Sequence, residues 1–375
     1  MDIPQNLSEK NQSLQSENRR LRERLLELYV QIDSLSAIAE DKGIFEQTDS
    51  TEEKQNLLSN TGNLFSKNPN YIQQRSKPEF EFNQTENIIL PGGAIYSATV
   101  NPKSTFIAVG SLSGTITILT HNLKTSSTLN GHSFACRDVI WGSPGLISCG
   151  FDKTIRIWDV ETNTNQCFET NGLAHSVTVL EGDENSIFAA AGTHIYWIDK
   201  RRQTPITISS ECKTTAVSSF QDYILFGGYD GYVNIVDRRH LHGGIISHVS
   251  LEGGPISSIS KVLPSGQCIG ISMNNSPMLI QLNESKTSTK PLPFDPPERF
   301  GCRGDIIGKN IIFENDYSTM CGGKMSAFSD GSNTPTLLKD INGFKYGAIF
   351  MGNIAQKIIT YSEDGVVSMW SAHQS

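Results

Sequence analysis

Two patterns of hydrophobic and polar residues divide the chain. From Leu7 to Leu35 leucine recurs at every seventh position, whereas after Ile88 short apolar runs alternate with glycine, asparagine, aspartate and serine. A seven-residue spacing is that of a helix packed on another helix, and short alternating runs are typical of β-strands joined by tight turns. The sequence therefore predicts an all-β domain preceded by an N-terminal α-helical coiled coil.

The residues of the predicted helix seam occupy the a and d positions of the heptad: Leu7, Asn11, Leu14, Asn18, Leu21, Leu25, Leu28, Ile32 and Leu35. Such a narrow seam is buried only against a partner helix, and asparagine at a favours a parallel pair in fixed register. An amphipathic helix packed on its own domain is the alternative, although its apolar stripe is usually wider. We therefore expect residues 5–42 to form a parallel homodimeric leucine zipper.

The heptads do not indicate a DNA-reading zipper. Only "MDIPQN" precedes Leu7, which is too short for the basic helix that enters the major groove in bZIP proteins. The arginines inside the heptads are placed for intrahelical pairs such as Arg19 with Glu23. Residues 43–79 are polar without a sustained period, which predicts a flexible linker between the zipper and the β-domain.

The clearest β-rich unit runs from Leu129 to Thr162. Gly131-His132 opens it and Trp158-Asp159 closes it, with two strand patterns and turn residues between them. This unit resembles a WD repeat, a family whose members form β-propellers with one four-stranded antiparallel sheet per repeat of about 40–45 residues. The resemblance implies that residues 80–375 form a WD-repeat β-propeller.

The same unit matches the buried hydrogen-bond chain of that family at four positions: His132, Ser148, Asp152 and Trp158. In such a chain the aspartate accepts from the imidazole, the imidazole reaches the hydroxyl, and the hydroxyl accepts from the indole. The last copy offers the corresponding residues Thr360, Asp364 and Trp370. The His/Ser/Asp set also resembles a catalytic triad, but its spacing fits the blade and no GxSxG is present, so we expect a structural role.

Weaker copies extend this pattern, each with an aliphatic residue in the place of the closing tryptophan: Leu119, Ile198 and Val236. The 284 residues from Ile88 to Ser371 divide into seven units of about 41, which predicts a seven-bladed propeller, with six or eight blades as alternatives. A ring of blades that does not close leaves sheet edges exposed. Because an early strand usually completes the last blade in this family, we expect Phe80–Leu90 to supply the outer strand of the final blade.

Composition adds limits to this picture. The 32 glycines and 19% charged residues suit a turn-rich globular chain, and the formal net charge of −8 argues against a general nucleic-acid or anionic-membrane surface. Seven dispersed cysteines without a CxxC pair indicate neither a disulfide framework nor a zinc site. No signal-peptide pattern and no run of about 18 apolar residues is present. We therefore expect an intracellular protein, nuclear or cytoplasmic, that is neither secreted nor inserted in a membrane.

No sequence motif predicts catalysis or a cofactor. The chain has no phosphate-binding GxxxxGK[ST], no dinucleotide-binding GxGxxG between strand and helix, and no HExxH. His240 and His242 could touch a metal, but two histidines on a loop are more often simply exposed. We therefore expect no catalytic, cofactor-binding or metal site.

Two adjacent copies end on Asp-x-Arg, at Asp199–Arg201 and Asp237–Arg239. This string resembles the Trp/Tyr-Asp-x-Arg box with which WD-repeat substrate receptors of cullin ubiquitin ligases contact the ligase's propeller adaptor through the arginine. Here Ile198 and Val236 replace the aromatic residue. Arg201 and Arg239 are therefore candidate partner-binding residues, and the alternative is that each pairs with a neighbouring aspartate at the rim.

Taken together, these features predict a non-catalytic scaffold. The zipper pairs two copies, and the propeller faces recruit protein partners of a multiprotein complex, with no direct sequence-specific nucleic-acid binding. The order of coiled coil, linker and propeller resembles autophagy conjugation adaptors, splicing ubiquitin-ligase scaffolds, transcriptional corepressors and G-protein β subunits. A ubiquitin-ligase substrate receptor and a G-protein-β-like signalling subunit are the alternatives.

Overall fold

The computed structural model describes residues 80–374, except residues 102, 104, 143–144, 181, 184, 203, 253, 274–276, 283–286, 293–302, 308–309, 316–318, 325–335, 341–346, 355–356 and 363–364. The side chains of residues 80–83, 242–243, 305–358, 362 and 371–374 are likewise not described. The predicted coiled coil (5–42), the linker (43–79), all nine seam residues and Asp364 lie outside the described residues. The described residues belong to one compact unit, Gln73–Ser375.

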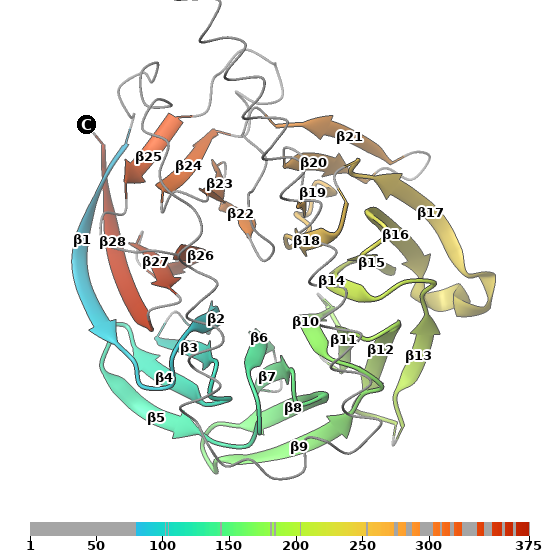
Figure 1. Ribbon diagram of the computed structural model, residues 1–375, viewed down its shortest axis with the longest axis horizontal. Helices are drawn as coiled ribbons and strands as arrows, with labels where there is room; N and C mark the ends of the chain where they lie inside the picture. Colours follow the sequence, from blue (N-terminus) through green and yellow to red (C-terminus); the bar gives the residue numbers. More distant parts are fainter. Residues whose placement is uncertain are drawn as a thin grey trace, which may run out of the picture. The chain divides into compact units, whose positions relative to one another are not determined.

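The described strands form four-stranded antiparallel sheets that follow one another along the chain (Figure 1). Sheet 1 contains β2 (Ile95–Val100), β3 (Phe106–Ser111), β4 (Ile116–Thr120) and β5 (Thr125–Leu129). Sheet 2 contains β6 (Cys136–Gly142), β7 (Gly145–Gly150), β8 (Thr154–Asp159) and β9 (Thr164–Glu169). Sheet 3 contains β10 (Ala174–Val179), β11 (Ser186–Ala191), β12 (His194–Asp199) and β13 (Ile206–Ser209).

The remaining sheets repeat this order. Sheet 4 contains β14 (Thr214–Phe220), β15 (Tyr223–Gly228), β16 (Tyr232–Asp237) and, after the 3-10 turn η2 (Arg238–Gly243), β17 (Ile245–Ser250). Sheet 5 contains β18 (Ile256–Ile259), β19 (Gln267–Ser272), β20 (Met278–Gln281) and β21 (Ser288–Pro291). Sheet 6 contains β22 (Gly304–Ile307), β23 (Asn310–Asn315), β24 (Thr319–Lys324) and β25 (Thr336–Asp340). Sheet 7 contains β26 (Gly347–Ile354), β27 (Lys357–Ser362), β28 (Val366–Gln374) and β1 (Phe80–Ile89).

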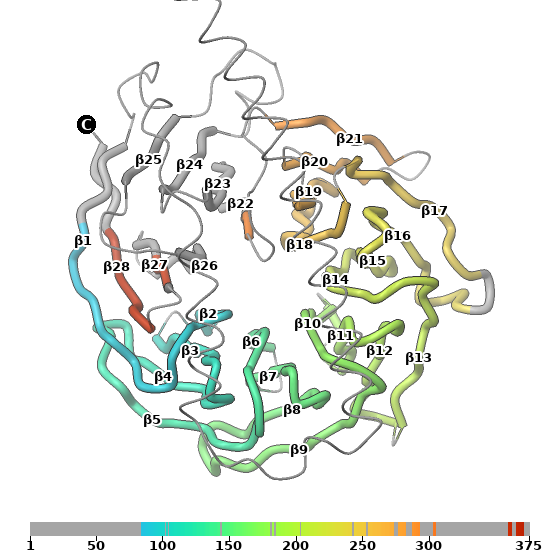
Figure 2. The backbone as a smooth tube through the Cα atoms, in the orientation of Figure 1, coloured from blue at the N-terminus to red at the C-terminus, as the bar shows by residue number. Residues whose placement is uncertain are grey.

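The sheets are arranged in a ring around their inner strands. β2 contacts β6, β6 contacts β10, β10 contacts β14, and β14 contacts β18. In sheet 6, β22 contacts β19 of sheet 5 and β26 of sheet 7, and β26 contacts β2. Figure 2 traces the chain from the outer strand of one sheet to the inner strand of the next for β5 to β6, β9 to β10 and β13 to β14. Because four antiparallel strands bring the chain back to the end where it started, every inner strand begins at the same end of the ring. We call this end the front rim and the other end the back rim.

β1 closes the ring. It pairs with β28 from Phe80↔Gln374 to Ile89↔Val366 and forms the outer edge of sheet 7, although β1 and β28 lie at opposite ends of the described chain (Figure 1). The Leu90 amide extends the pairing by donating to the Gly365 carbonyl at 2.8 Å. The sequence prediction that Phe80–Leu90 supplies the outer strand of the final sheet is confirmed.

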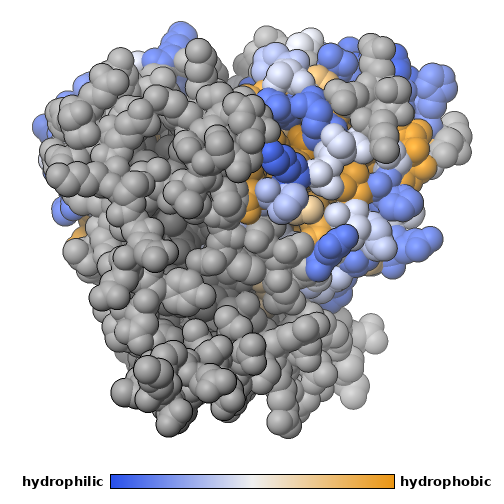
Figure 3. Space-filling view, turned by 90° about the horizontal axis from the view of Figure 1, so that it is seen from above, coloured by the Kyte–Doolittle hydropathy of each residue, from blue (hydrophilic) through white to orange (hydrophobic). Residues whose placement is uncertain are grey.

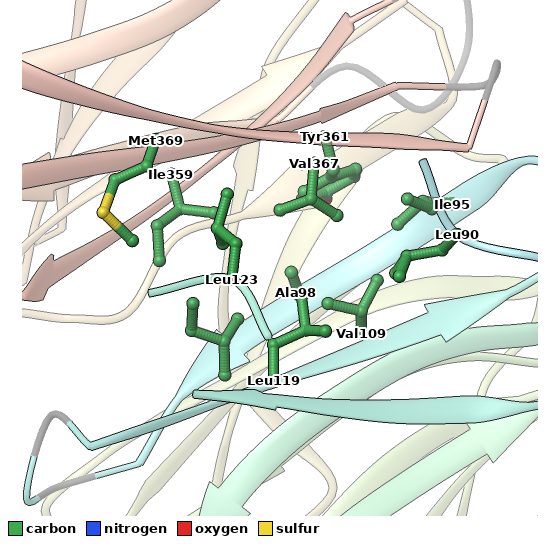
Figure 4. Close-up of a cluster of buried hydrophobic side chains, with 11 residues drawn as sticks. Leu90, Ile95, Ala98, Val109, Leu119, Leu123, Ile359, Tyr361, Val367 and Met369 are labelled. Carbon is green, nitrogen blue, oxygen red and sulfur yellow. The ribbon is translucent and has the colours of Figure 1, made fainter. Parts of the chain in front are cut away.

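The hydrophobic core lies between neighbouring sheets rather than in one centre. One cluster joins sheet 7 to sheet 1, with Ile359, Tyr361, Val367 and Met369 facing side chains of the first sheet such as Leu119 (Figure 4). Similar clusters lie between sheets 1 and 2, 2 and 3, 3 and 4, and 4 and 5. Strands inside the stack are therefore buried on both faces, which explains continuous apolar runs such as "SIFAAA" in β11.

The outermost strands have a different character from the inner ones. β5 and β9 are mostly exposed along their length and carry mostly polar residues, whereas β17 begins with two exposed isoleucines, Ile245 and Ile246. In the view of Figure 3 the described surface mixes hydrophilic and hydrophobic residues. Within the described part of the chain, no helix is long and apolar enough to cross a membrane.

Two adjacent isoleucines test the closing strand. Ile88 of β1 packs against the core between sheets 7 and 1, whereas the neighbouring Ile89 is 73% exposed. We expect Ile88→Ala to lower the free energy of unfolding by about 1–2 kcal/mol, because packed apolar area is lost. Ile89→Ala, the matched control, should change it by less than about 0.5 kcal/mol. Urea titration of the two variants gives both values, and equal effects would contradict the packing of β1.

Candidate functional site

A buried hydrogen-bonded chain ties sheet 2 together at the front rim. His132 precedes β6 and its Nδ1 lies 2.9 Å from Asp152 Oδ1 in the β7–β8 turn. The other ring nitrogen, Nε2, lies 2.7 Å from Ser148 Oγ of β7, and the Trp158 indole of β8 donates to the same hydroxyl at 2.8 Å. The structure thus brings together the four residues that the sequence groups in this repeat. One chain of contacts links the incoming loop, a turn and two strands.

Asp152 is the charged member of this chain and has several donors. It accepts from the Ser133 amide at 3.1 Å, the Thr154 amide at 3.2 Å and the Thr154 hydroxyl at 2.9 Å. Burial by itself raises the pKa of the Asp152 carboxyl, but the hydrogen bond and charge of His132 with the other donors hold it below its ordinary value. The carboxylate is therefore stabilised in its ionised form.

In this hydrogen-bonded group the Ser148 hydroxyl is not placed to attack a substrate. Ser148 is fully buried, at 0% exposure, and its Oγ already contacts both His132 and Trp158. Gly131 completes the packing, because a Cβ there would lie 2.6 Å from Trp158 Cη2. The arrangement acts as a clamp on the fold, since every member is hydrogen-bonded within the sheet.

Two other sheets also contain a hydrogen bond from a tryptophan indole to a hydroxyl. In sheet 7 the Trp370 indole donates to the Thr360 hydroxyl at 2.8 Å, and both residues are buried. In sheet 3 the Trp197 indole donates to Ser186 Oγ at 3.1 Å. The sequence comparison places Ile198 in the tryptophan position, so this pair one residue earlier was missed. Ile198 instead pairs in register with Ile187 and joins the core between sheets 2 and 3.

The two candidate arginines lie at the back rim and are built alike. Asp199 accepts from the Arg201 amide at 3.0 Å and from Arg201 Nε at 2.8 Å. Asp237 accepts from the Arg239 amide and from Arg239 Nε, each at 2.9 Å. The hydrogen bond from each arginine lowers the pKa of its aspartate and raises that of the guanidinium. Both side chains stay more than half exposed, at 59% and 53%.

Arg238, which sequence inspection did not single out, joins two sheets beside these residues. Its Nη1 lies 3.3 Å from Asp183 Oδ2 in sheet 3, and its Nε lies 3.0 Å from Asp222 Oδ1 in sheet 4. Asp183 also lies 3.5 Å from Arg201 Nη2. A network of charges therefore bridges sheets 3 and 4 at the back rim, and no local spacing could have identified the Arg238–Asp183 contact.

A second group that the sequence did not reveal lies at the ring centre. Asp138 of β6 is 5% exposed and accepts from four donors. These donors are Ser97 Oγ of β2 at 2.8 Å, the Val139 amide at 3.1 Å, the Val177 amide of β10 at 3.0 Å and Arg303 Nη1 at 3.0 Å. Arg303 immediately precedes β22 of sheet 6. One carboxylate thus connects three consecutive inner strands with a sheet further round the ring.

Metal-ligand side chains do not gather among the described residues, where no group of three or more His, Cys, Asp or Glu could hold an ion. The His240 side chain is 78% exposed and its Nδ1 lies 3.7 Å from Asp237 Oδ2. The cysteines whose side chains are described, from Cys136 to Cys268, are free thiols. Burial raises the pKa of the Cys268 thiol to about 12, so that thiol is not a reactive thiolate.

Comparison with known proteins agrees with this geometry. Residues 123–159 match the family model described as WD domain, G-beta repeat, a span that includes the whole hydrogen-bonded chain of sheet 2. The fold is similar to the Cps50 (Swd1) β-propeller domain of Myceliophteria thermophila, with a TM-score of 0.64 and 16% identity over 77% of this chain and 99% of that one. The fold is therefore that of an all-β propeller, and one of its repeats, residues 123–159, matches the WD-repeat family model.

Curated relatives match over part of their length. The ribosome biogenesis protein YTM1 of Coprinopsis cinerea is 30% identical over 149 residues, which are 34% of this chain and 31% of that protein. Zinc finger CCCH domain-containing protein 17 of Oryza sativa subsp. japonica is 31% identical over 87 residues, 22% of this chain and 20% of that protein. The chain thus aligns with about a third and a fifth of these relatives.

Removal of the shared hydroxyl tests the clamp in sheet 2. Ser148→Ala leaves His132 Nε2 and the Trp158 indole without their buried partner. We expect the free energy of unfolding to fall by about 2–4 kcal/mol, since each orphaned group loses its compensation for burial. Ser126→Ala, at an exposed position of β5, is the matched control and should be nearly neutral. Denaturant unfolding measures both, and a neutral Ser148→Ala would refute the clamp.

The charge of Asp152 predicts a pH dependence of known sign. Its folded-state pKa lies below the ordinary value of 3.8, so its contribution to stability is present at neutral pH and is lost as pH falls through and below 3.8. Asp152→Asn should therefore be less stable than the parent at neutral pH. The difference should shrink as the solution is acidified, which urea titrations across this range would measure. A difference that stays constant or grows in acid would contradict the assignment.

Proposed function

We propose that the protein is a non-catalytic scaffold that is dimerised by its N-terminal zipper and recruits protein partners on the propeller faces. In this proposal the sheets are the seven blades of one closed ring. The main observation in its favour is that the side chains that could act in catalysis are used to hold the fold together. His132, Ser148 and Asp152 are hydrogen-bonded to one another inside a blade, which leaves the loop-lined rims of a rigid ring for recognition.

The similarities support assembly with other proteins in a multiprotein complex. The curated relative with the longer match is named a ribosome biogenesis protein, and the fold neighbour is a β-propeller domain. The named role of that relative supports a location inside the cell, in the nucleus or the cytoplasm. The absence of a motif for base readout in the sequence argues for protein partners rather than sequence-specific nucleic acid.

Dimerisation would add affinity without new contacts. When two propellers are joined by zippers and linkers, the second binding event on a bivalent or repeated partner becomes intramolecular. Overall affinity can then exceed that of one propeller by orders of magnitude, provided that the linkers reach. Residues 43–79, which the sequence predicts to be flexible, would provide that reach.

Light scattering of the full chain tests the dimer. We expect a mass of twice 41.2 kDa. Leu21→Glu combined with Leu28→Glu should give the single-chain mass, because two charges would be buried in the seam. Ser13→Glu combined with Ser34→Glu, both at the outward c position, is the matched control and should remain a dimer. A parent chain that is monomeric would refute self-pairing and favour the alternative of a G-protein-β-like subunit, whose helix needs a different partner.

A substrate receptor of a cullin-RING ubiquitin ligase is the second candidate function. The observation in its favour is that Arg201 and Arg239 are held in the same way at the same rim and remain more than half exposed. If they contact the ligase's propeller adaptor, Arg201→Glu with Arg239→Glu should abolish adaptor pull-down. Arg201→Lys with Arg239→Lys keeps the charge but loses the paired hydrogen bonds, so it should weaken capture less. Unchanged capture by the glutamate variant would remove this candidate.

A further inference from the structure

Four cationic or basic residues lie where inner strands begin. Arg137 and His175 are the second residues of β6 and β10, and Lys213 and Arg303 immediately precede β14 and β22. Since every inner strand begins at the front rim, these residues surround one end of the ring centre. β6 contacts β10 and β10 contacts β14, so three of the four belong to consecutive sheets.

The carboxylates beside them are already committed. Asp138, next to Arg137, accepts from Ser97, Val139, Val177 and Arg303 at 2.8–3.1 Å. Asp152, the other acidic group of sheet 2 at this rim, is held by His132 and Thr154. Within the described residues, neither carboxylate makes a hydrogen bond or an ion pair with the Arg137 guanidinium, although the charge of Asp138 acts to raise the pKa of Arg137.

Arg137 and His175 have polar side-chain atoms without a hydrogen-bond partner among the described residues. The described contact of the Arg137 guanidinium is with the Tyr96 ring, at 5.5 Å from the ring centroid, and within the described residues it has neither a hydrogen bond nor an ion pair. His175 Nδ1 is buried and has no hydrogen-bond partner among the described residues, while the ring packs edge-on against Phe151 at 5.2 Å. Groups of this kind are usually satisfied in folded proteins.

The charges also repel one another. Burial first, and then the charges of Arg137 and Lys213, lower the pKa of His175 to about 3, so its imidazole is neutral near pH 7. Burial and the charge of Arg303 likewise lower the pKa of Arg137. This concentration of positive charge lies in a chain whose formal net charge is −8. An anion placed here would relieve this repulsion and would accept hydrogen bonds from the Arg137 guanidinium.

We propose that the front-rim cluster of Arg137, His175 and Lys213 binds an anionic side chain, a carboxylate or a phosphate, on an acidic peptide segment of a partner protein. The Arg137 guanidinium provides two parallel donors for such a group, and the neutral His175 donates from its protonated ring nitrogen. A peptide fits better than a nucleic acid, because the cations are gathered at the ring centre instead of forming a long basic stripe. This assignment rests on the proposed scaffold function and names the chemistry of its partner.

Fluorescence anisotropy of the full chain with labelled peptides tests the assignment. Three Gly/Ser-rich peptides of equal length carry glutamates, phosphoserines or, as a neutral control, glutamines. We expect the first or the second to bind, the glutamine peptide not to bind, and Arg137→Gln to weaken binding by about tenfold or more. Arg202→Gln, whose side chain is 58% exposed at the back rim, is the matched control and should bind as the parent does. Thermal melts confirm that both variants fold.

The glutamate and phosphoserine arms identify which anion is the ligand. Three outcomes would overturn the assignment. The Arg137→Gln variant could bind the peptide as tightly as the parent, or Arg202→Gln could lose as much affinity as Arg137→Gln. The third is that a single-stranded oligonucleotide binds more tightly than either peptide. Partner capture by the full chain separates this result from the scaffold proposal. If Arg137→Gln captures the same proteins from a lysate as the parent while peptide binding fails, the scaffold stands and the anion site falls.

Discussion

The fold depends on pairing two strands that lie at opposite ends of the described chain. β1 forms the outer edge of sheet 7, next to β28, and its residue Ile88 packs on the same core that joins this sheet to sheet 1. Without β1, the last sheet would have three strands and an exposed edge in β28. Each sheet buries its faces only between two neighbours, so an opening at one place exposes core on both sides of the break. Closure is therefore a property of the whole ring.

Within the ring, polar contacts are used where they can be fully satisfied. Sheet 2 has the complete chain from Asp152 to Trp158, and the described residues of sheets 3 and 7 include a hydrogen bond from an indole to a hydroxyl. Elsewhere, aliphatic residues such as Leu119 and Val236 take the tryptophan position and join apolar clusters. Buried polar networks are stabilising only when complete, so apolar replacement costs a sheet little. This explains why one repeat is recognisable from sequence and its neighbours are not.

Local patterns were enough to predict much of this structure, and long-range pairs were not. The Gly-His opening, the turn aspartate and Trp158 lie within one repeat, and the early strand Phe80–Leu90 follows from the need to close a ring. Trp197 was missed because it stands one residue before the expected tryptophan position, which Ile198 occupies. The Arg303–Asp138 and Arg238–Asp183 contacts join different sheets. No spacing along the sequence encodes which distant charges meet at a rim or at the ring centre.

These features describe a rigid ring with distinct ends. Charged residues bridge sheets 3 and 4 at the back rim, and basic residues surround the centre at the front rim. Closure by β1 is the claim on which all else rests. It is tested most directly by thermal unfolding of two shortened chains, residues 44–375 and residues 91–375. The account predicts that the first retains the full chain's cooperative transition and that the second unfolds at a much lower temperature. Indistinguishable transitions for the two chains would contradict it.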